Sequence, residues 1–218
     1  MTITILHPSF GRPEMAIATA KNWMLKASDP GNIEYILCIS VQDPLRNQYD
    51  DLVGELSFIT LHQHPHANMV KQLNLAATWA KGDLFINVSD DFDCPQHWDK
   101  SLLDALAGHY DYVVKTDDGI KVNGINSDNI ISLPIMDRAY YSRFGYIYHP
   151  DYNHFFGDEE LSNVADKLGR KITLPITFEH IHYTMGKGKE DATNKKNNRH
   201  FDNDKATFKI RKQKNFGI

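Results

Sequence analysis

The fold of this chain is decided by the stretch L-F-I-N-V-S-D-D-F-D, residues 84–93. It begins with a short apolar run, which is typical of a buried strand in a parallel or mixed sheet. Three carboxylates, Asp90, Asp91 and Asp93, follow where that strand is expected to end. Ligands of open α/β sheets bind at the carboxyl ends of strands. Crowded carboxylates repel one another, so the cluster predicts either a divalent cation among the oxygens or a solvated turn that caps the next helix.

The composition predicts one globular domain with a basic tail. The chain has 218 residues, of which 41% are hydrophobic, and this is enough for a full core. After residue 185, ten Lys or Arg stand against four Asp or Glu. The net charge of −4 therefore divides into +6 for this tail and −10 for the remainder. We predict a domain over residues 1–185 and a basic, flexible tail over 186–218 that could contact phosphates.

The sequence also favours a cytoplasmic protein. No apolar run approaches the ~20 residues of a membrane span, and the start of the chain does not resemble a signal peptide. Two cysteines, Cys38 and Cys94, make no disulfide framework, which is the pattern of a reduced compartment.

Strands and helices are expected to alternate on both sides of this stretch. Strands are predicted at residues 2–7, 33–39, 58–61 and 84–88, with helices after Pro13, Asn68 and Trp98. This alternation predicts a doubly wound, mostly parallel sheet. Beyond Tyr112 the pattern indicates shorter, antiparallel strands, then a helix over 161–168 and a last strand over 172–178.

The order of the motifs resembles that of the family-two glycosyltransferases of the GT-A fold. The motifs are P-S-F-G-R-P at 8–13, Asp43, the helix with Asn68, Lys71 and Asn74, K-G-D-L-F-I at 81–86 leading into D-D-F-D, G-D-E-E-L at 157–161, and H-I-H at 180–182. The resemblance covers residues 2–185. It implies a single α/β, Rossmann-like domain whose central mixed, mostly parallel sheet is flanked by helices. It also implies transfer of a sugar from a nucleotide-diphosphate sugar, a UDP-sugar in our expectation, with inversion.

The resemblance assigns a role to each motif. The nucleotide-sugar donor would be bound by Pro8, Arg12, Asp43, Asn68, Lys71, Asp90 and Asp91. A cation, Mn²⁺ or Mg²⁺, would be held by Asp91, Asp93, His180 and His182. Asp91 and Asp93 form the expected pair because alternate residues of an extended segment point the same way. Asp158 would be the catalytic base, with Glu159 second. The chain departs from the family pattern at Gly157, where Glu is usual, and at Val41-Gln42-Asp43.

Simpler interpretations stay open for these residues. Arg12 could be a surface loop residue, Asp43 could begin a turn, and Asn68 and Asp158 could cap helices. His62, His64 and His66 alternate and could suggest zinc, although Pro65 and the loop context weaken this idea.

Two other functions compete with sugar transfer. One is a nucleotidyltransferase on a similar fold, although Gly11-Arg12 is a poor version of its Gly-rich basic loop. The other is a nucleic-acid-binding protein that uses residues 205–214, with Phe208 and Phe216 for stacking. The acceptor of a transferred sugar could be a glycan, a protein, a lipid or a nucleic acid.

Overall fold

The computed structural model describes residues 1–66, 68–120, 129–181 and 190–218. The strands are β1 (Ile3–Ser9), β2 (Ile33–Ser40), β3 (Ile59–His64), β4 (Leu84–Asn87), β5 (Phe92–Asp93), β6 (Val113–Asp117), β7 (Ile135–Asp137), β8 (Lys171–Thr177) and β9 (Glu179–His180). The helices are α1 (Pro13–Lys26), α2 (Arg46–Val53), α3 (Met69–Ala77), α4 (Trp98–Ala105), α5 (Arg138–Phe144), α6 (Gly157–Lys167), α7 (Ala192–Asn198) and α8 (Phe201–Gln213). Short 3₁₀ turns lie at Pro30–Asn32 and Asn215–Gly217.

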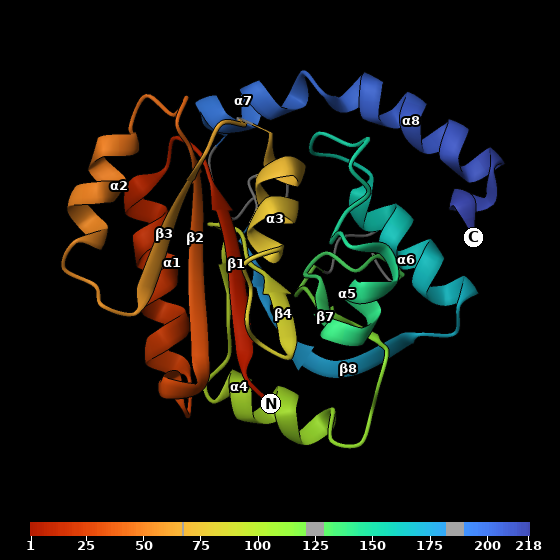
Figure 1. Ribbon diagram of the computed structural model, residues 1–218, viewed down its shortest axis with the longest axis horizontal. Coiled ribbons are helices and arrows are strands. Elements are labelled where there is room, and N and C mark those ends of the chain that lie inside the picture. The colour runs from red at the N-terminus through yellow and green to blue at the C-terminus, as the bar shows by residue number, and fades with distance from the viewer. Residues whose placement is uncertain (67, 121–128, 182–189) are drawn as a thin grey trace.

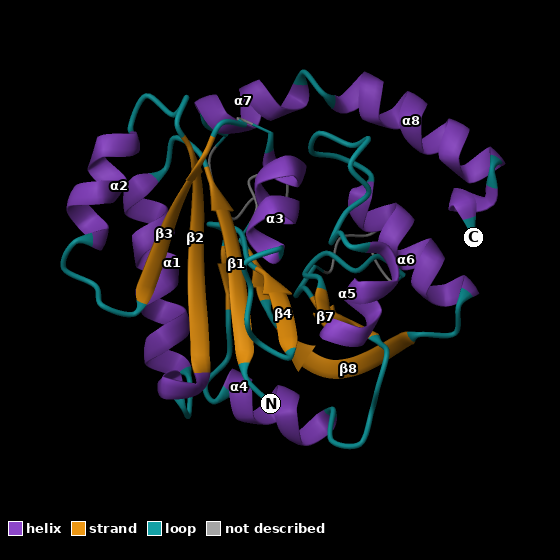
Figure 2. Ribbon diagram, viewed as in Figure 1, coloured by secondary structure: helices purple, strands orange, loops and turns teal. Residues whose placement is uncertain are grey.

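The main sheet is mixed and mostly parallel, as the sequence predicted. Within the described ranges its strand order is β3-β2-β1-β4-β7-β6-β8 (Figure 2). Strand β7 runs antiparallel to both of its neighbours, β4 and β6, and the other pairs are parallel. A separate ribbon pairs β5 with β9 in antiparallel fashion. The antiparallel strand lies in the half of the chain where the sequence predicted a change of pattern.

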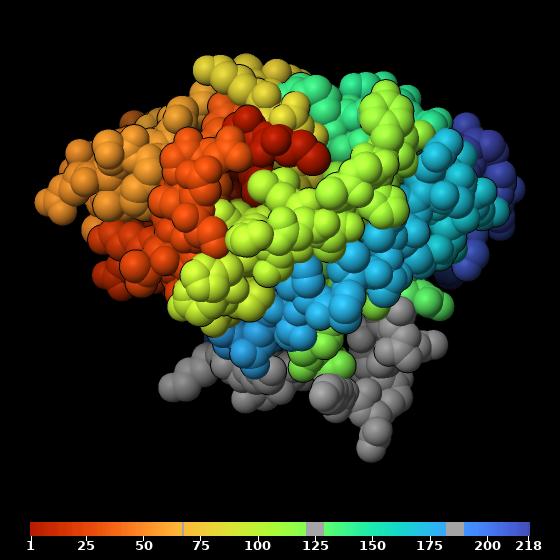
Figure 3. Space-filling view, turned by 90° about the horizontal axis from the view of Figure 1, so that it is seen from below, coloured from red at the N-terminus to blue at the C-terminus, as the bar shows by residue number. Residues whose placement is uncertain are grey.

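Helices cover both faces of this sheet (Figure 1). Ile3 and Ile5 of β1 pack in a core cluster with residues of α1 and α4, whereas Leu6 belongs to a second cluster with residues of α3 and α6. Successive side chains of a strand point to opposite faces, so a strand buried on both faces must be apolar throughout. In the first cluster, the ring of Trp23 lies 5.0 Å from Trp98 and 5.4 Å from Phe178. Seen from below, α4 and β8 lie side by side over one face of the molecule (Figure 3).

The part of the basic tail that the structure describes is mostly helical. Helices α7 and α8 form most of residues 190–218 and run along one side of the molecule (Figure 1). Phe208, Phe216 and Asp204 are buried, and Arg211 forms an ion pair of 2.7 Å with Glu160 of α6. The overall polarity of the tail concealed these anchors. Asp204, Phe208 and Arg211 are spaced four and three residues apart and so share one side of α8, and Phe216 lies in the 3₁₀ turn after it. None of the described helices has the length and apolar character needed to cross a membrane.

Candidate functional site

A cavity of about 300 Å³ lies at the carboxyl ends of β1 and β4. Parallel strands present their carboxyl ends at one edge of the sheet, so the loops after β1 and β4 meet there. The cavity is lined by Pro8, Ser9, Phe10, Arg12, Met69, Gln72, Asn87, Ser89, Asp90, Asp91, Phe92, Ser132, Tyr148, His154, Phe155, Phe156, Asp158, His180, Thr193, Asn194 and Asn197. The structure thus gathers Pro8, Arg12, Asp90, Asp91, Asp158 and His180 from the predicted residues into one space.

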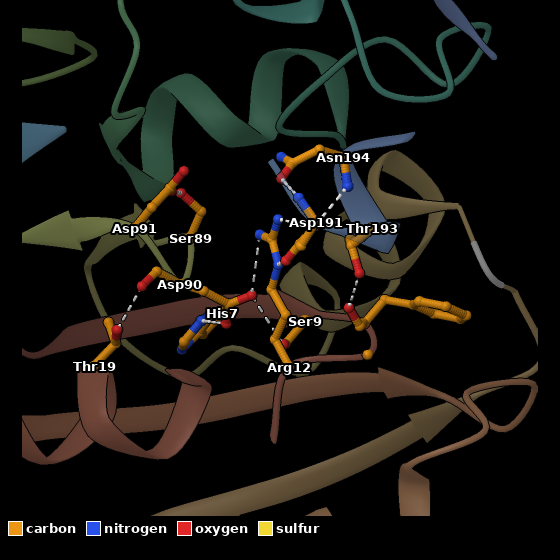
Figure 4. Close-up of polar contacts among 12 residues, drawn as sticks. His7, Ser9, Arg12, Thr19, Ser89, Asp90, Asp91, Asp191, Thr193 and Asn194 are labelled. Atoms are coloured by element: carbon orange, nitrogen blue, oxygen red, sulfur yellow. Dashed lines mark hydrogen bonds and ion pairs between the residues drawn. The ribbon is translucent and has the colours of Figure 1, made fainter. Parts of the chain in front are cut away.

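Asp90 is fixed by groups of β1 and α1 (Figure 4). One carboxylate oxygen lies 2.9 Å from Nε2 of His7, and the other accepts a hydrogen bond of 3.2 Å from Ser9. The hydroxyl of Thr19 donates to the backbone carbonyl of Asp90 at 2.8 Å. Nδ1 of His7 lies 2.7 Å from the hydroxyl of Tyr35 on β2. These contacts hold the Asp90 carboxylate at one position in the cavity wall.

Asp91 and His180 face each other across the same wall. Oδ2 of Asp91 lies 3.4 Å from Nε2 of His180, and Oδ1 of Asp91 accepts a hydrogen bond of 2.6 Å from Ser89. The pairing of β5 with β9 places Phe92 opposite His180, and their stacked rings are 4.3 Å apart. A carboxylate oxygen and an imidazole nitrogen therefore lie close together, and both are ligand types that divalent cations take.

Asp93 does not line the cavity with this pair, although the alternation led us to expect it there. Asp90 and Asp91 form a turn in which the N–H of Phe92 donates to Ser89 at 3.2 Å, so the extended alternation does not apply to them. Oδ1 of Asp93 accepts hydrogen bonds from Lys26 at 2.6 Å and Asn22 at 2.5 Å. Burial by itself would raise the pKa of Asp93, and these hydrogen bonds outweigh it and lower the pKa.

Described residues provide no larger metal cluster. Among the described residues, no group of three or more His, Cys, Asp or Glu side chains could hold a metal ion. The alternating His62, His64 and His66 therefore do not form such a group. His182 lies outside the described residues. Hence the candidate cation site of the described chain is the pair formed by Asp91 and His180.

Arg12 does not lie free on the surface but is bound by Asp191, the N-cap residue of α7. Its guanidinium donates to both carboxylate oxygens of Asp191, at 2.6 and 2.9 Å, and lies 3.7 Å from Asp90 (Figure 4). Asp191 also caps α7 by accepting the N–H of Asn194 at 2.9 Å. The hydroxyl of Thr193 donates to the carbonyl of Phe10 at 2.9 Å. The first loop and α7 are thus tied together at the mouth of the cavity.

Three of the predicted donor residues lie outside the cavity lining. Asp43 is buried and accepts the N–H groups of Gly11 at 2.5 Å and Leu45 at 2.8 Å, so it joins the loops after β1 and β2. Asn68 caps α3 by accepting the N–H of Lys71 at 3.1 Å. The side chain of Lys71 is exposed. The geometry favours the structural interpretation of Asp43 and Asn68.

Asp158 lines the cavity from the first turn of α6. The N-cap of that helix is Phe156, so Asp158 is not the cap residue. Burial raises the pKa of Asp158, although a hydrogen bond of 2.9 Å from the N–H of Glu159 and the charge of His180 act in the opposite direction. Burial also raises the pKa of Glu159, which is not part of the lining. Of the two candidate bases, Asp158 is therefore the one that lines the cavity, and burial raises its pKa.

Several site residues were not found from the sequence. His7 lies within the apolar run of β1, and a polar residue at a buried strand position is a signal that could have been used. His154 lines the cavity, and burial lowers its pKa to about 4. Within the described chain, Nδ1 of His154 has no hydrogen-bond partner. Neither Ser89 nor His154 has a sequence signal of its own, because the position of each in the cavity depends on tertiary neighbours.

The overall fold of the chain is similar to that of several solved structures. A mannosyltransferase, PcManGT from Pyrobaculum calidifontis in complex with GDP-Man and Mn²⁺, superposes with a TM-score of 0.66 at 16% identity, over 83% of this chain and 57% of that one. The chain has a GT-A fold. Residues 1–349 of S. aureus TarS match with TM-scores of 0.64 in complex with UDP and 0.63 with UDP-GlcNAc, both at 16% identity. These two alignments cover 82% and 87% of this chain and 59% and 62% of TarS 1–349.

The chain is thus shorter than its structural neighbours, and it spans 57–62% of the length of these three. No protein-family model matches its sequence, and no curated protein matches it. The likeness between the GT-A proteins and this chain is therefore one of fold.

Proposed function

We propose that this protein transfers a sugar from a nucleotide-diphosphate sugar to a hydroxyl group of an acceptor. The observation that carries the proposal is that Asp91, His180 and Asp158 line one cavity at the carboxyl ends of β1 and β4. The PcManGT and TarS structures of the same fold hold GDP-Man, UDP and UDP-GlcNAc. The proposal has two more specific parts, namely that the donor is a UDP-sugar and that the configuration of the anomeric carbon is inverted.

Asp91 and His180 would hold the divalent cation, Mn²⁺ or Mg²⁺. Small sites of this kind take one or two carboxylates, and substrate phosphates and water complete the coordination, so two side chains fit such a site. When bound, the cation would neutralise the charge on the leaving diphosphate. The fixed Asp90 carboxylate lies next to this pair, where it suits hydrogen bonds from the hydroxyl groups of the donor.

Asp158 would take the proton from the acceptor hydroxyl. A general base works best when its pKa lies near the operating pH, and burial moves the pKa of Asp158 upward. Direct attack by the deprotonated hydroxyl would displace the nucleotide and invert the anomeric carbon. Arg12 would contact the diphosphate once its bonds to Asp191 are exchanged for phosphate oxygens, because both are anionic partners for a planar guanidinium.

The proposal is tested by calorimetry of UDP binding with and without Mn²⁺. Asp91→Asn should lose the Mn²⁺-dependent part of the affinity, because an amide is a poor ligand for a hard cation. Asp93→Asn is the matched control, since Asp93 bonds to Lys26 instead of lining the cavity, and its affinity should stay within about two-fold. Equal losses in both variants, or none in Asp91→Asn, would refute the assignment.

The products of slow donor hydrolysis separate the two enzymatic functions. A glycosyltransferase should release UDP and free sugar from UDP-GlcNAc or another UDP-sugar. A nucleotidyltransferase would release UMP and a sugar phosphate, and that result would overturn the proposal. The cytoplasmic location expected from the sequence stays a prediction.

A further inference from the structure

Helix α8 extends the rim of the cavity with an exposed aromatic side chain. Phe155 and Phe156 line the cavity, and the ring of Phe201 lies 5.4 Å from each of their rings. Phe201 is 42% exposed, so the aromatic surface continues from the cavity to the outside. The buried carboxylate of Asp204 accepts the backbone N–H groups of residues 153–155. This rim is therefore fixed to α8.

A row of lysines continues from this aromatic surface along α8. Lys205, Lys209 and Lys212 are spaced four and three residues apart, so they share one side of the helix, and all three are exposed. Nζ of Lys205 lies 5.6 Å from the ring centre of Phe201, and Nζ of Lys212 lies 5.6 Å from that of Phe208. At a rise of about 1.5 Å per residue the row is roughly 10 Å long. Figure 1 shows α8 extending away from α7 beside α6.

Ion pairs within the part of the chain that the structure describes do not neutralise these lysines. Among the described residues no ion pair engages any of the three, whereas the neighbouring Arg211 is paired with Glu160. The charge of Lys212 lowers the pKa of Glu159, although burial raises it more, so the positive field reaches the residue next to Asp158. Like charges at this spacing weaken a helix slightly. Ion pairing within the described chain therefore does not explain the row.

We propose, on the basis of the proposed function, that the acceptor is a phosphate-bearing chain. Its sugar packs on Phe155, Phe156 and Phe201, and its phosphates lie along Lys205, Lys209 and Lys212. The C–H faces of sugar rings are apolar and pack well on aromatic rings. An ammonium group is a compact point charge that suits phosphate oxygens. The acceptor hydroxyl then reaches Asp158 from the side of α8.

An anionic bilayer fits this surface less well. A membrane-binding helix carries large apolar side chains between its cations, and the exposed Ile210 lies about 100° around the helix from Lys209. The lysine row instead adjoins the aromatic rim of the cavity. This continuity favours an acceptor that enters the cavity over a surface to which the whole protein adheres.

The test measures binding of short-chain inorganic polyphosphate by the full chain in the absence of donor. The variant Lys205→Gln/Lys209→Gln/Lys212→Gln should bind it at least ten-fold more weakly, and the slope of log affinity against log salt should fall by about two. The control is Lys21→Gln/Lys81→Gln/Lys100→Gln, which changes the charge equally at exposed positions away from α8, and it should bind within two-fold of the parent.

Binding to phosphatidylglycerol vesicles is measured alongside. Four results would overturn the proposal: the parent protein does not bind polyphosphate, both variants lose the same polyphosphate affinity, the α8 variant loses none, or the α8 variant loses only its binding to the vesicles. Donor hydrolysis by the parent protein is measured in parallel. Because polyphosphate binding needs no donor, its failure is distinguishable from a failure of donor hydrolysis, which would refute the proposed function instead.

Discussion

Replacement of Asp204 by alanine should release α8 from the domain. The carboxylate accepts the N–H groups of Asn153 at 3.1 Å, His154 at 2.8 Å and Phe155 at 2.9 Å, together with Nδ2 of Asn153 at 2.9 Å. Asp204 is fully buried, so alanine would leave three backbone donors without a partner. Each such donor costs about 1–3 kcal/mol, and water entering the gap relieves part of the cost. We therefore expect a loss of about 3–5 kcal/mol.

The matched control is Asp202→Ala, which removes an exposed carboxylate from the same first turn of α8. It should change the free energy of unfolding by less than about 0.5 kcal/mol. For a chain of this size Tm falls about 2–4 °C per kcal/mol, so Asp204→Ala should lower Tm by roughly 6–20 °C. Urea unfolding and hydrogen exchange at residues 153–155 measure the global and the local effect. If the two variants differ by less than about 1 kcal/mol and exchange at 153–155 is unchanged, the anchoring role of Asp204 is refuted.

Three further predictions follow from the site and the core. Asp158→Asn should lower turnover by roughly 10²–10⁴-fold with donor affinity preserved, and the parent's activity should rise with pH through a midpoint above the ordinary 3.8 of an aspartate; a parent-like rate in the variant would exclude Asp158 as the base. Asp191→Asn should free Arg12 and tighten UDP binding several-fold by calorimetry, whereas weaker binding would mean that Asp191 positions Arg12 for the donor. His64 is buried, and burial lowers its pKa to about 4. The neutral ring stabilises the fold above its unfolded pKa of about 6.5, and this stability is lost as the pH falls toward 4. Between pH 7 and pH 5 the free energy of unfolding, measured with urea, should fall by about 2 kcal/mol more in the parent than in His64→Phe, and equal losses would contradict the prediction.

The sheet was predictable because its information is local. The apolar runs of β1, β2 and β4 and the helix after Asn68 can be read within a few residues, and so can the acidic end of β4. Asn68 was expected to cap α3, and it does. Asp91, Asp158 and His180 were predicted as site residues from the order of motifs, and all three line the cavity. That order reflects how successive strands end at one edge of the sheet.

The sequence was less informative where a turn or a distant partner decides the geometry. The pairing of Asp91 with Asp93 assumed an extended segment, and the turn at Asp90 and Asp91 removed that condition. The flexible tail was inferred from composition, which averages over α8 and hides Asp204 and Phe208 on its buried side. Contacts such as that of Arg12 with Asp191 join residues 179 positions apart, and no local pattern encodes them.

The β5–β9 ribbon determines when the proposed cation site can form. Asp91 and His180 are brought together by two short strands that lie outside the main sheet, after almost the whole described domain has been traced. Contacts of such long sequence separation carry a high closure entropy and tend to form late in folding. Substitutions in this ribbon could therefore alter the geometry around a bound cation while the seven strands of the main sheet stay intact. The residues of the site and those of the core can in this way diverge independently over evolutionary time.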